Sequence, residues 1–149
     1  MRKSLGKRKT NKMAKKKVKK DYTYAIGRRR SASARVRLYK GRQESLVNDE
    51  LIGKYFPGAV MAYKWQRPFE LTGTVERYYV TVRVAGGGKE GQIDAVVLGI
   101  ARALSKADSG KFRSVLKKEG LLTRDSRIRE RRMVGTGGRA RKQKQSPKR

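Results

Sequence analysis

The sequence of 149 residues contains neither cysteine nor histidine. Their absence excludes disulfide bonds, thiolate nucleophiles, zinc sites built from Cys and His, and acid–base catalysis by histidine. Acidic residues are also scarce, with 12 Asp and Glu against 41 Lys and Arg. Close acidic pairs such as Glu90 with Asp94 fit first helical turns, where negative charge offsets the helix dipole. We therefore predict a protein that is not an enzyme and that has no catalytic residue, metal, cofactor or small-molecule substrate.

Long apolar runs are missing as well. The longest stretch without a formal charge covers nine residues, Tyr55–Tyr63. A membrane-spanning helix needs about 20 apolar residues, and a signal peptide would have its apolar region at the N-terminus. We expect no membrane partner.

Positive charge is what the sequence has in excess. The formal net charge is +29, and a compact state tolerates such a charge mainly when a polyanion neutralises it. Residues 1–20 contain 11 basic residues and no acidic one, and residues 123–149 contain 11 basic and two acidic residues. Segments of this composition cannot build a core. We predict a basic N-terminal extension at 1–21 and a basic C-terminal tail at 123–149, both ordered by nucleic acid, around a globular RNA-binding domain at 22–122.

The central segment has the periodicity of strands followed by helices. Apolar and polar residues alternate at 22–26, at 35–39 and most clearly over Tyr78–Ala85. Apolar residues then recur with helical spacing over Lys89–Ala107, and a last helix is expected over Gly110–Glu119. This order favours an α+β fold, a two-layer α/β sandwich with helices on one face of a mixed sheet.

Three shorter elements are expected in between. Asn48 can cap a helix over Asp49–Tyr55, and a second short helix is expected over Ala59–Trp65. A strand is expected around Phe69–Thr72. Most tyrosines of the domain, together with its tryptophan, are expected to serve the core.

Five arginines lie within ten residues, in and between the first two predicted strands: Arg28, Arg29, Arg30, Arg35 and Arg37. Guanidinium groups bind phosphate oxygens in a fork and stack on bases, so we predict that this group contacts RNA. The glycine-rich run Gly86–Gln92 follows a predicted strand and precedes a helix. We favour a tight turn there, with an RNA phosphate contact as the alternative, because the Lys-Ser/Thr pair of a nucleotide P-loop is missing.

Six blocks occur together and in a fixed order. They are Gly27-Arg-Arg-Arg-Ser-Ala-Ser-Ala-Arg-Val36, Gln66-Arg-Pro-Phe-Glu-Leu71, Gly86-Gly-Gly-Lys-Glu-Gly-Gln92, Gly99-Ile-Ala-Arg-Ala-Leu104, Thr123-Arg-Asp-Ser-Arg127 with Glu130-Arg-Arg, and the final Lys148-Arg149. From about Tyr24 to the C-terminus, the sequence resembles the bacterial type of the small-subunit ribosomal protein S9 family. That family usually ends in an aromatic residue before Ser-Lys-Arg, whereas this chain ends in Ser146-Pro-Lys-Arg149.

The resemblance implies a sandwich like the second domain of ribosomal protein S5. It implies a structural constituent of the small-subunit head, on the 3′ major domain of the ribosomal RNA, with neighbouring ribosomal proteins of the head as partners. The setting would be a cytoplasmic ribosome, with an organellar one left open. The tail would reach the anticodon stem-loop of peptidyl-site tRNA through Lys148 and Arg149. Contacts to ribosomal RNA are implied for Arg28, Arg29, Arg30, Arg35, Arg37, Arg124, Arg127, Arg131, Arg132, Arg139, Arg141 and Lys142.

Two other functions compete with this one. A nucleic-acid-compacting or nuclear protein is suggested by Lys7-Arg-Lys9 and Lys15-Lys-Lys17, which resemble a nuclear targeting run. Such a protein would sediment with DNA. A small kinase is suggested by the glycine-rich loop alone, and no residue offers a credible catalytic base for it.

Overall fold

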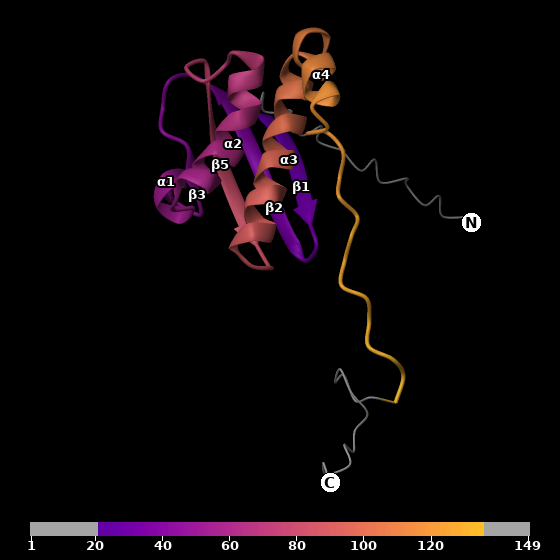
Figure 1. Ribbon diagram of the computed structural model, residues 1–149. Coiled ribbons are helices and arrows are strands. Elements are labelled where there is room, and N and C mark those ends of the chain that lie inside the picture. Colours follow the sequence, from indigo (N-terminus) through magenta and orange to yellow (C-terminus); the bar gives the residue numbers. More distant parts are fainter. Residues whose placement is uncertain (1–20, 136–149) are drawn as a thin grey trace, which may run out of the picture.

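The computed structural model describes residues 21–135 (Figure 1). In chain order the elements are β1 (Thr23–Arg29), β2 (Ala32–Lys40), β3 (Leu46–Val47), β4 (Glu50–Leu51), α1 (Ile52–Tyr55), α2 (Ala59–Thr72), β5 (Tyr78–Ala85), α3 (Lys89–Ala107) and α4 (Ser109–Lys118). The strands predicted first and the last two helices are therefore confirmed, with β5 and α3 at the predicted bounds.

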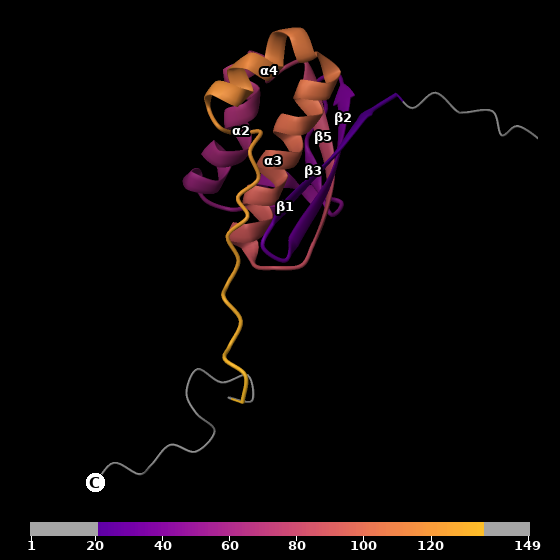
Figure 2. The same cartoon turned by 90° about the vertical axis from the view of Figure 1, so that its right-hand side faces the viewer.

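The five strands form one mixed sheet. Their order is β1-β2-β5-β3-β4, with β3 parallel to β5 and the other pairs antiparallel. Helices α2, α3 and α4 all lie on the same side of this sheet, and no helix covers its other face in residues 21–135 (Figure 2). The predicted two-layer α/β sandwich is confirmed.

The core lies between α3 and the three long strands. The helical spacing of Ile93, Val96, Ile100 and Leu104 places these side chains on one face of α3, which meets the sheet. Each fully buried aliphatic side chain contributes about 1.5–3 kcal/mol through removal from water. The largest fully buried side chains on the two layers are Ile93, Val96, Ile100 and Leu104 from the helix, with Val36, Val80 and Val82 from the strands.

Helix α3 approaches β1 closely at two glycines. A Cβ atom on Gly27 would overlap the carbonyl oxygen of Ala95 and lie 2.6 Å from the backbone nitrogen of Gly99. A Cβ atom on Gly99 would in turn lie 2.5 Å from Cγ2 of Val36. The two backbones pack at this point only because neither residue has a side chain.

The expected strand at Phe69–Thr72 is wrong, because these residues complete α2. The helix continues through Pro68, although proline supplies no N–H for the carbonyl of Lys64. Both Pro68 and Phe69 are buried, and this packing outweighs the lost hydrogen bond. The helix ends at Gly73, whose left-handed φ of 61° and N–H bond to Glu70 form the C-cap.

The helix expected over Asp49–Tyr55 begins only at Ile52. Asn48 and Asp49 have positive φ values of 50° and 69° and form the turn between β3 and β4 instead. The side chain of Asn48 does not cap the helix. Its Oδ1 accepts from the backbone N–H of Val84 at 2.9 Å, and its Nδ2 donates to the Val84 carbonyl at 3.1 Å. Asn48 thus continues the hydrogen bonding of β5 beyond the end of β3.

Strand β1 lies at an edge of the sheet and is covered by cations from α3. Arg102 donates to the carbonyl of Ile26 at 3.0 Å, and Lys106 donates to the carbonyl of Tyr24 at 3.0 Å. Charged groups on an edge strand prevent pairing with another chain. Over residues 21–135, the helices lack the length and apolar character needed to cross a bilayer.

Candidate nucleic-acid interface

The face of the sheet opposite the helices is lined with arginine. Alternation along β1, β2 and β5 buries every second residue against the helices and directs the others outward. The three strands together contain six basic residues and no acidic one. We call the outward side the arginine face, formed by Tyr24, Ile26, Arg35, Arg37, Tyr39, Tyr79, Thr81 and Arg83.

Pairing between the strands brings the arginines of this face together. Arg35 is the register partner of Arg83, and Arg37 is the partner of Thr81. These side chains, with Tyr22 and Tyr24, surround a hollow of about 310 Å³. Like charges at directly opposite positions destabilise a sheet when nothing neutralises them. The arrangement therefore favours a bound anion.

Three tyrosines close one end of the arginine face. The ring of Tyr39 stacks on that of Tyr79 at 5.1 Å, with Tyr22 tilted against Tyr39 at 5.5 Å. The guanidinium of Arg37 lies 5.3 Å from the centre of the Tyr22 ring. These rings are half-buried on the arginine face, so the expectation that most tyrosines serve the core is wrong for them. Tyr55 and Tyr78 do pack against the core.

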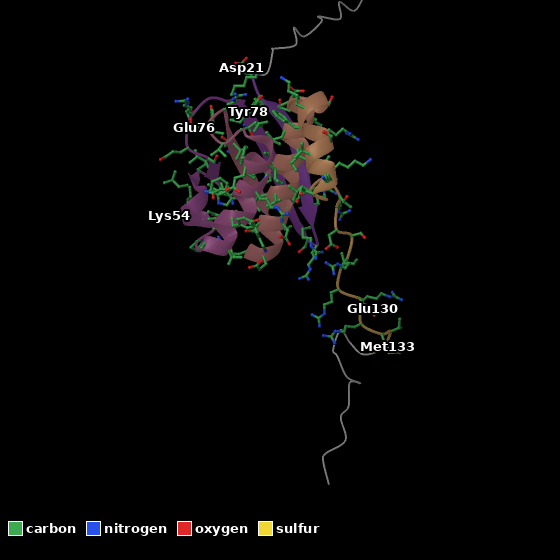
Figure 3. The ribbon with its side chains drawn as sticks, turned by 45° about the horizontal axis from the view of Figure 1, so that its top comes forward. Asp21, Lys54, Glu76, Tyr78, Glu130 and Met133 are labelled. Atoms are coloured by element: carbon green, nitrogen blue, oxygen red, sulfur yellow. The ribbon has the colours of Figure 1, made fainter. Side chains whose placement is uncertain are left out.

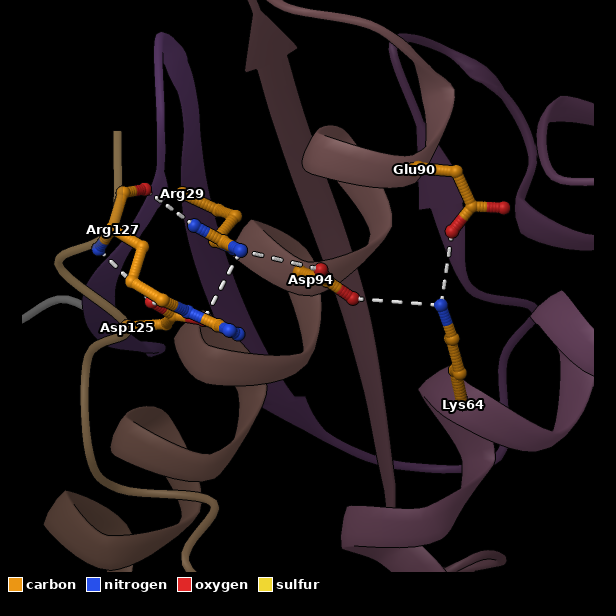
Figure 4. A network of polar contacts seen from close by, with 6 residues as sticks. All are labelled: Arg29, Lys64, Glu90, Asp94, Asp125 and Arg127. Carbon is orange, nitrogen blue, oxygen red and sulfur yellow. Dashed lines mark hydrogen bonds and ion pairs between the residues drawn. The ribbon is translucent and has the colours of Figure 1, made fainter. Parts of the chain in front are cut away.

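The β1–β2 hairpin carries the next three predicted arginines. Arg28 and Arg30 are exposed, and Arg30 has a left-handed φ of 49° in the turn. The side chain of Arg29 is only 12% exposed, because it is directed into a network of ion pairs (Figure 4). The sequence alone did not show that Arg29 is held in ion pairs whereas Arg28 and Arg30 are exposed.

Arg29 holds the beginning of the C-terminal tail. Its Nη2 lies 3.0 Å from Oδ2 of Asp125, and its Nη1 donates to the carbonyl of Arg127 at 2.7 Å. Arg127 closes the arrangement, since its Nη2 donates to Oδ2 of Asp125 at 2.7 Å (Figure 4). We call these three residues the tail clasp.

The tail clasp is tied to the helical layer. Nε of Arg29 lies 3.8 Å from Asp94 on α3, and Asp94 also pairs with Lys64 of α2 at 3.6 Å. Lys64 donates to Glu90 at 3.0 Å, and this hydrogen bond is the main reason that the pKa of Lys64 is raised. The start of the tail is thus held by Arg29 of β1, which is itself linked to α3 through Asp94 and from there to α2 through Lys64.

Hydrogen bonds from Arg127 hold the pKa of Asp125 well below its usual value, with the charge of Arg29 adding to the effect. The usual pKa of an aspartate is about 3.9. A depressed pKa means that the clasp contributes its full stability above that value and loses it only as the pH falls further and the carboxyl is protonated. The clasp is therefore intact at neutral pH.

Beyond the clasp the tail leaves the domain. It runs beside α3 and then away from the fold (Figures 1 and 2). Its apolar side chains are as exposed as its basic ones, with Ile128 at 71% and Val134 at 87%. Four predicted RNA-binding residues are exposed on it: Arg124, Arg127 of the clasp, Arg131 and Arg132. The other predicted tail residues lie outside the described range: Arg139, Arg141, Lys142, Lys148 and Arg149, as do residues 1–20 of the extension.

Replacing Asp125 with Asn should free the start of the tail, because the amide keeps the shape of the carboxylate but not its charge. The chain has no cysteine, so spin labels on Ile128→Cys and Ser114→Cys would report a single distance between tail and α4. We expect a narrow distance distribution in the parent chain and a broad one in Asp125→Asn. The matched change Glu130→Gln should leave it narrow. Equal widths in all three chains would contradict the clasp.

The glycine-rich loop forms the predicted tight turn between β5 and α3. Gly86 and Gly87 have left-handed φ values of 76° and 67°, and a Cβ on Gly86 would lie 2.5 Å from the carbonyl oxygen of Ser31. The following Lys89 is exposed and contacts α1, with its Nζ 3.3 Å from the centre of the Tyr55 ring and 3.1 Å from the Tyr55 carbonyl oxygen. The loop therefore serves packing against the hairpin.

Among the arginines of the arginine face, sequence reasoning missed one, Arg83. The alternation along β5 placed Arg83 on the polar side of its strand, but nothing in the sequence gave its neighbour. Only the β2–β5 register brings it beside Arg35.

Comparison with known proteins agrees with the resemblance. Residues 27–149 match the family model described as ribosomal protein S9/S16. A protein of Solidesulfovibrio magneticus is 49% identical over 118 residues, which is 79% of this chain and 90% of that protein. One of Maridesulfovibrio salexigens is 44% identical over 121 residues (81% and 92%), and one of Rickettsia rickettsii is 44% identical over 126 residues (85% and 78%). All three are named small ribosomal subunit protein uS9. The chain thus belongs to the ribosomal protein S9/S16 family, a family of structural proteins, and the prediction of a protein that is not an enzyme is confirmed.

Proposed function

We propose that this chain is a structural constituent of the head of the small ribosomal subunit in the cytoplasm. Its domain binds the 3′ major domain of the ribosomal RNA, and its tail extends to the anticodon stem-loop of peptidyl-site tRNA. The names of its relatives support the small subunit as the setting. The finer assignments rest on the family resemblance and on the distribution of charge.

The proposal that the domain binds RNA is supported mainly by the positive charge of the arginine face. The three strands of this face contain no carboxylate. Its arginines lie around one hollow, and no carboxylate within the described residues 21–135 pairs with them. Phosphates from an RNA backbone supply the counter-charge, and this kind of contact recognises the shape of the RNA more than its sequence. The half-buried tyrosines at its end provide apolar surface for a sugar or a base.

The tail clasp gives the tail a defined starting point. RNA binding would order a segment that exposes both basic and apolar side chains, at an entropic cost for each residue ordered. A start fixed by Arg29 and Asp125 reduces the number of directions that the tail can take before it meets RNA.

Sedimentation of ribosomes tests the proposal. In a sucrose gradient of cell extract, the chain should migrate with the small subunit, and ultraviolet crosslinking should join it to RNA of the head. Treatment with DNase should not move it. Migration with DNA, or as a free monomer, would contradict the proposal and would favour the nucleic-acid-compacting alternative.

Deletion of Lys148 and Arg149 should weaken binding of tRNA to the peptidyl site while leaving assembly of small subunits intact. Two charge-assisted contacts are worth about 1–3 kcal/mol together, so we expect a loss of about tenfold in a filter-binding assay with purified subunits. The double change Arg2→Gln and Lys3→Gln removes the same charge at the other end and should have no effect. Unchanged tRNA affinity in the deletion variant would contradict the role of the tail end.

A further inference from the structure

One side of the domain departs from the basic character of the chain. A hollow of about 510 Å³ lies between the β4–α1 segment and α2, and we call it the apolar hollow. Lys54, Glu76 and Tyr78 lie on this side of the domain, away from Glu130 and Met133 of the tail (Figure 3). The main side chains that line the hollow are Leu51, Ile52, Trp65, Phe69, Val75 and Tyr78, with Glu44, Glu70 and Lys54.

The hollow exposes apolar surface that the fold does not use. Leu51 is 44% exposed and Val75 is 58% exposed, although both are aliphatic residues at its rim. In the described part of the chain, the indole Nε1 of Trp65 is buried without a hydrogen-bond acceptor. An unpaired buried donor is costly.

The charge around the hollow is opposite to that of the arginine face. Residues 42–55 and 65–78 together contain five acidic and four basic residues, in a chain whose net charge is +29. Two of those basic residues already have carboxylate partners, since Arg42 pairs with Glu76 at 3.4 Å and Arg67 with Glu119 at 2.8 Å. Across residues 21–135, no ion pair engages the two carboxylates of the hollow, Glu44 and Glu70.

The apolar walls and free carboxylates of the hollow indicate which kind of molecule can bind there. Free carboxylates repel a phosphate backbone and aliphatic side chains offer it no hydrogen bond, so RNA does not fit. Apolar side chains interspersed with lysine or arginine do fit, because they match both the walls and the charge. The N-terminal extension of this chain has 11 basic residues and little apolar content in positions 1–20, which suits phosphate better than an apolar hollow. A neighbouring protein of the same particle is the remaining source.

We propose that the apolar hollow is a protein-docking site that binds a basic, apolar segment of a neighbouring ribosomal protein, so that the domain contacts RNA with one side and protein with another. This rests on the proposed function, because it is the ribosome that supplies such a neighbour. The sides are separate in sequence as well, since the arginine face comes from β1, β2 and β5, whereas the hollow is lined chiefly by the β4–α1 segment and α2.

Photocrosslinking in assembled small subunits tests the site. The photoreactive residue p-benzoylphenylalanine is placed at Val75, at the rim of the hollow, or at Arg83, on the arginine face, and each chain is expressed in cells and purified within small subunits. We expect position 75 to crosslink to a Lys- or Arg-containing segment of one ribosomal protein, identified by mass spectrometry, and position 83 to crosslink to RNA. A crosslink from position 75 to RNA, to residues 1–20 of this chain, or to nothing would overturn the docking site. A chain that never enters small subunits would instead contradict the proposed function.

A second measurement tests how much the carboxylates of Glu44 and Glu70 contribute to binding. The chain has one tryptophan, Trp65, so its fluorescence reports on the hollow when a synthetic peptide of the crosslinked segment is added to the full chain. The change Glu44→Gln with Glu70→Gln should weaken peptide binding about five- to tenfold, since two ion pairs are removed. Glu130→Gln, which removes one charge on the tail, should bind as the parent does. Equal affinities for all three chains, or no fluorescence change with the parent, would overturn the proposal.

Discussion

Replacing Arg35, Arg37 and Arg83 together with glutamine should lower the affinity for an RNA fragment of the subunit head by about 100-fold at 0.1 M salt. Each arginine that neutralises a phosphate releases condensed counterions, so three lost contacts should also make the plot of log affinity against log salt less steep by about 2. Folding should not suffer, because the three side chains lie outward and repel one another. Filter binding or fluorescence anisotropy over a range of salt concentrations measures both quantities.

A matched variant keeps this prediction specific. Arg113, Lys117 and Lys118 are exposed on α4, in the helical layer, and their replacement with glutamine removes the same charge. If binding depends only on net charge, the two triple variants should lose the same affinity and the same salt slope. We expect the α4 variant to lose less than tenfold. An equal or larger loss in that variant would show that the arginine face is not the interface.

Replacing Gly27 with alanine should strongly destabilise the domain. The new Cβ would overlap the carbonyl oxygen of Ala95 on α3, and two backbone segments must move apart to make room. Overpacking of this kind costs about 3 kcal/mol, which corresponds to a fall in Tm of about 12–20 °C for a domain of this size. Thermal unfolding of the full chain, followed by circular dichroism at 222 nm, measures the shift.

Gly53 provides the control for that experiment. It lies within α1, and a Cβ there would meet no atom within 4 Å. Gly53→Ala should therefore leave Tm unchanged or raise it slightly, since alanine is the better helix former. If Gly27→Ala had the same Tm as Gly53→Ala, the close contact between α3 and β1 would not have the energetic importance assigned to it.

Where a segment has one strong period, sequence and structure agree. Helix α3 and strand β5 have the predicted bounds because each has an uninterrupted apolar pattern and glycines at the adjoining turn. The segment around Pro68 shows the limit of this reasoning. Its local signals are a proline and a short apolar run, and both are compatible with a strand after a break. The segment is a helix because this conformation buries Phe69 against the core. That burial depends on residues far away in the sequence, which local signals do not show.

In the candidate site, too, the sequence predicted some features and only the structure showed the others. Alternation was enough to place Arg35 and Arg37 on a polar face, because side chains of a strand alternate between faces whatever its neighbours are. It could not show that Arg83 lies beside Arg35, nor that Arg29 pairs with Asp125 of the tail. Those contacts join residues that are distant in the chain, and strand pairing and the course of the tail determine them.

By itself, the sequence determined the composition of each part: a domain able to form a core, basic segments at both ends, strands with one arginine-bearing side, and the motifs of a ribosomal family. The tertiary structure decided which charges meet. It gathered arginines without carboxylates on one face, fixed the start of the tail with Arg29, and left carboxylates around an apolar hollow on another side. The physical reason is that composition is a local property, whereas an electrostatic field is a sum over charges that only packing brings together.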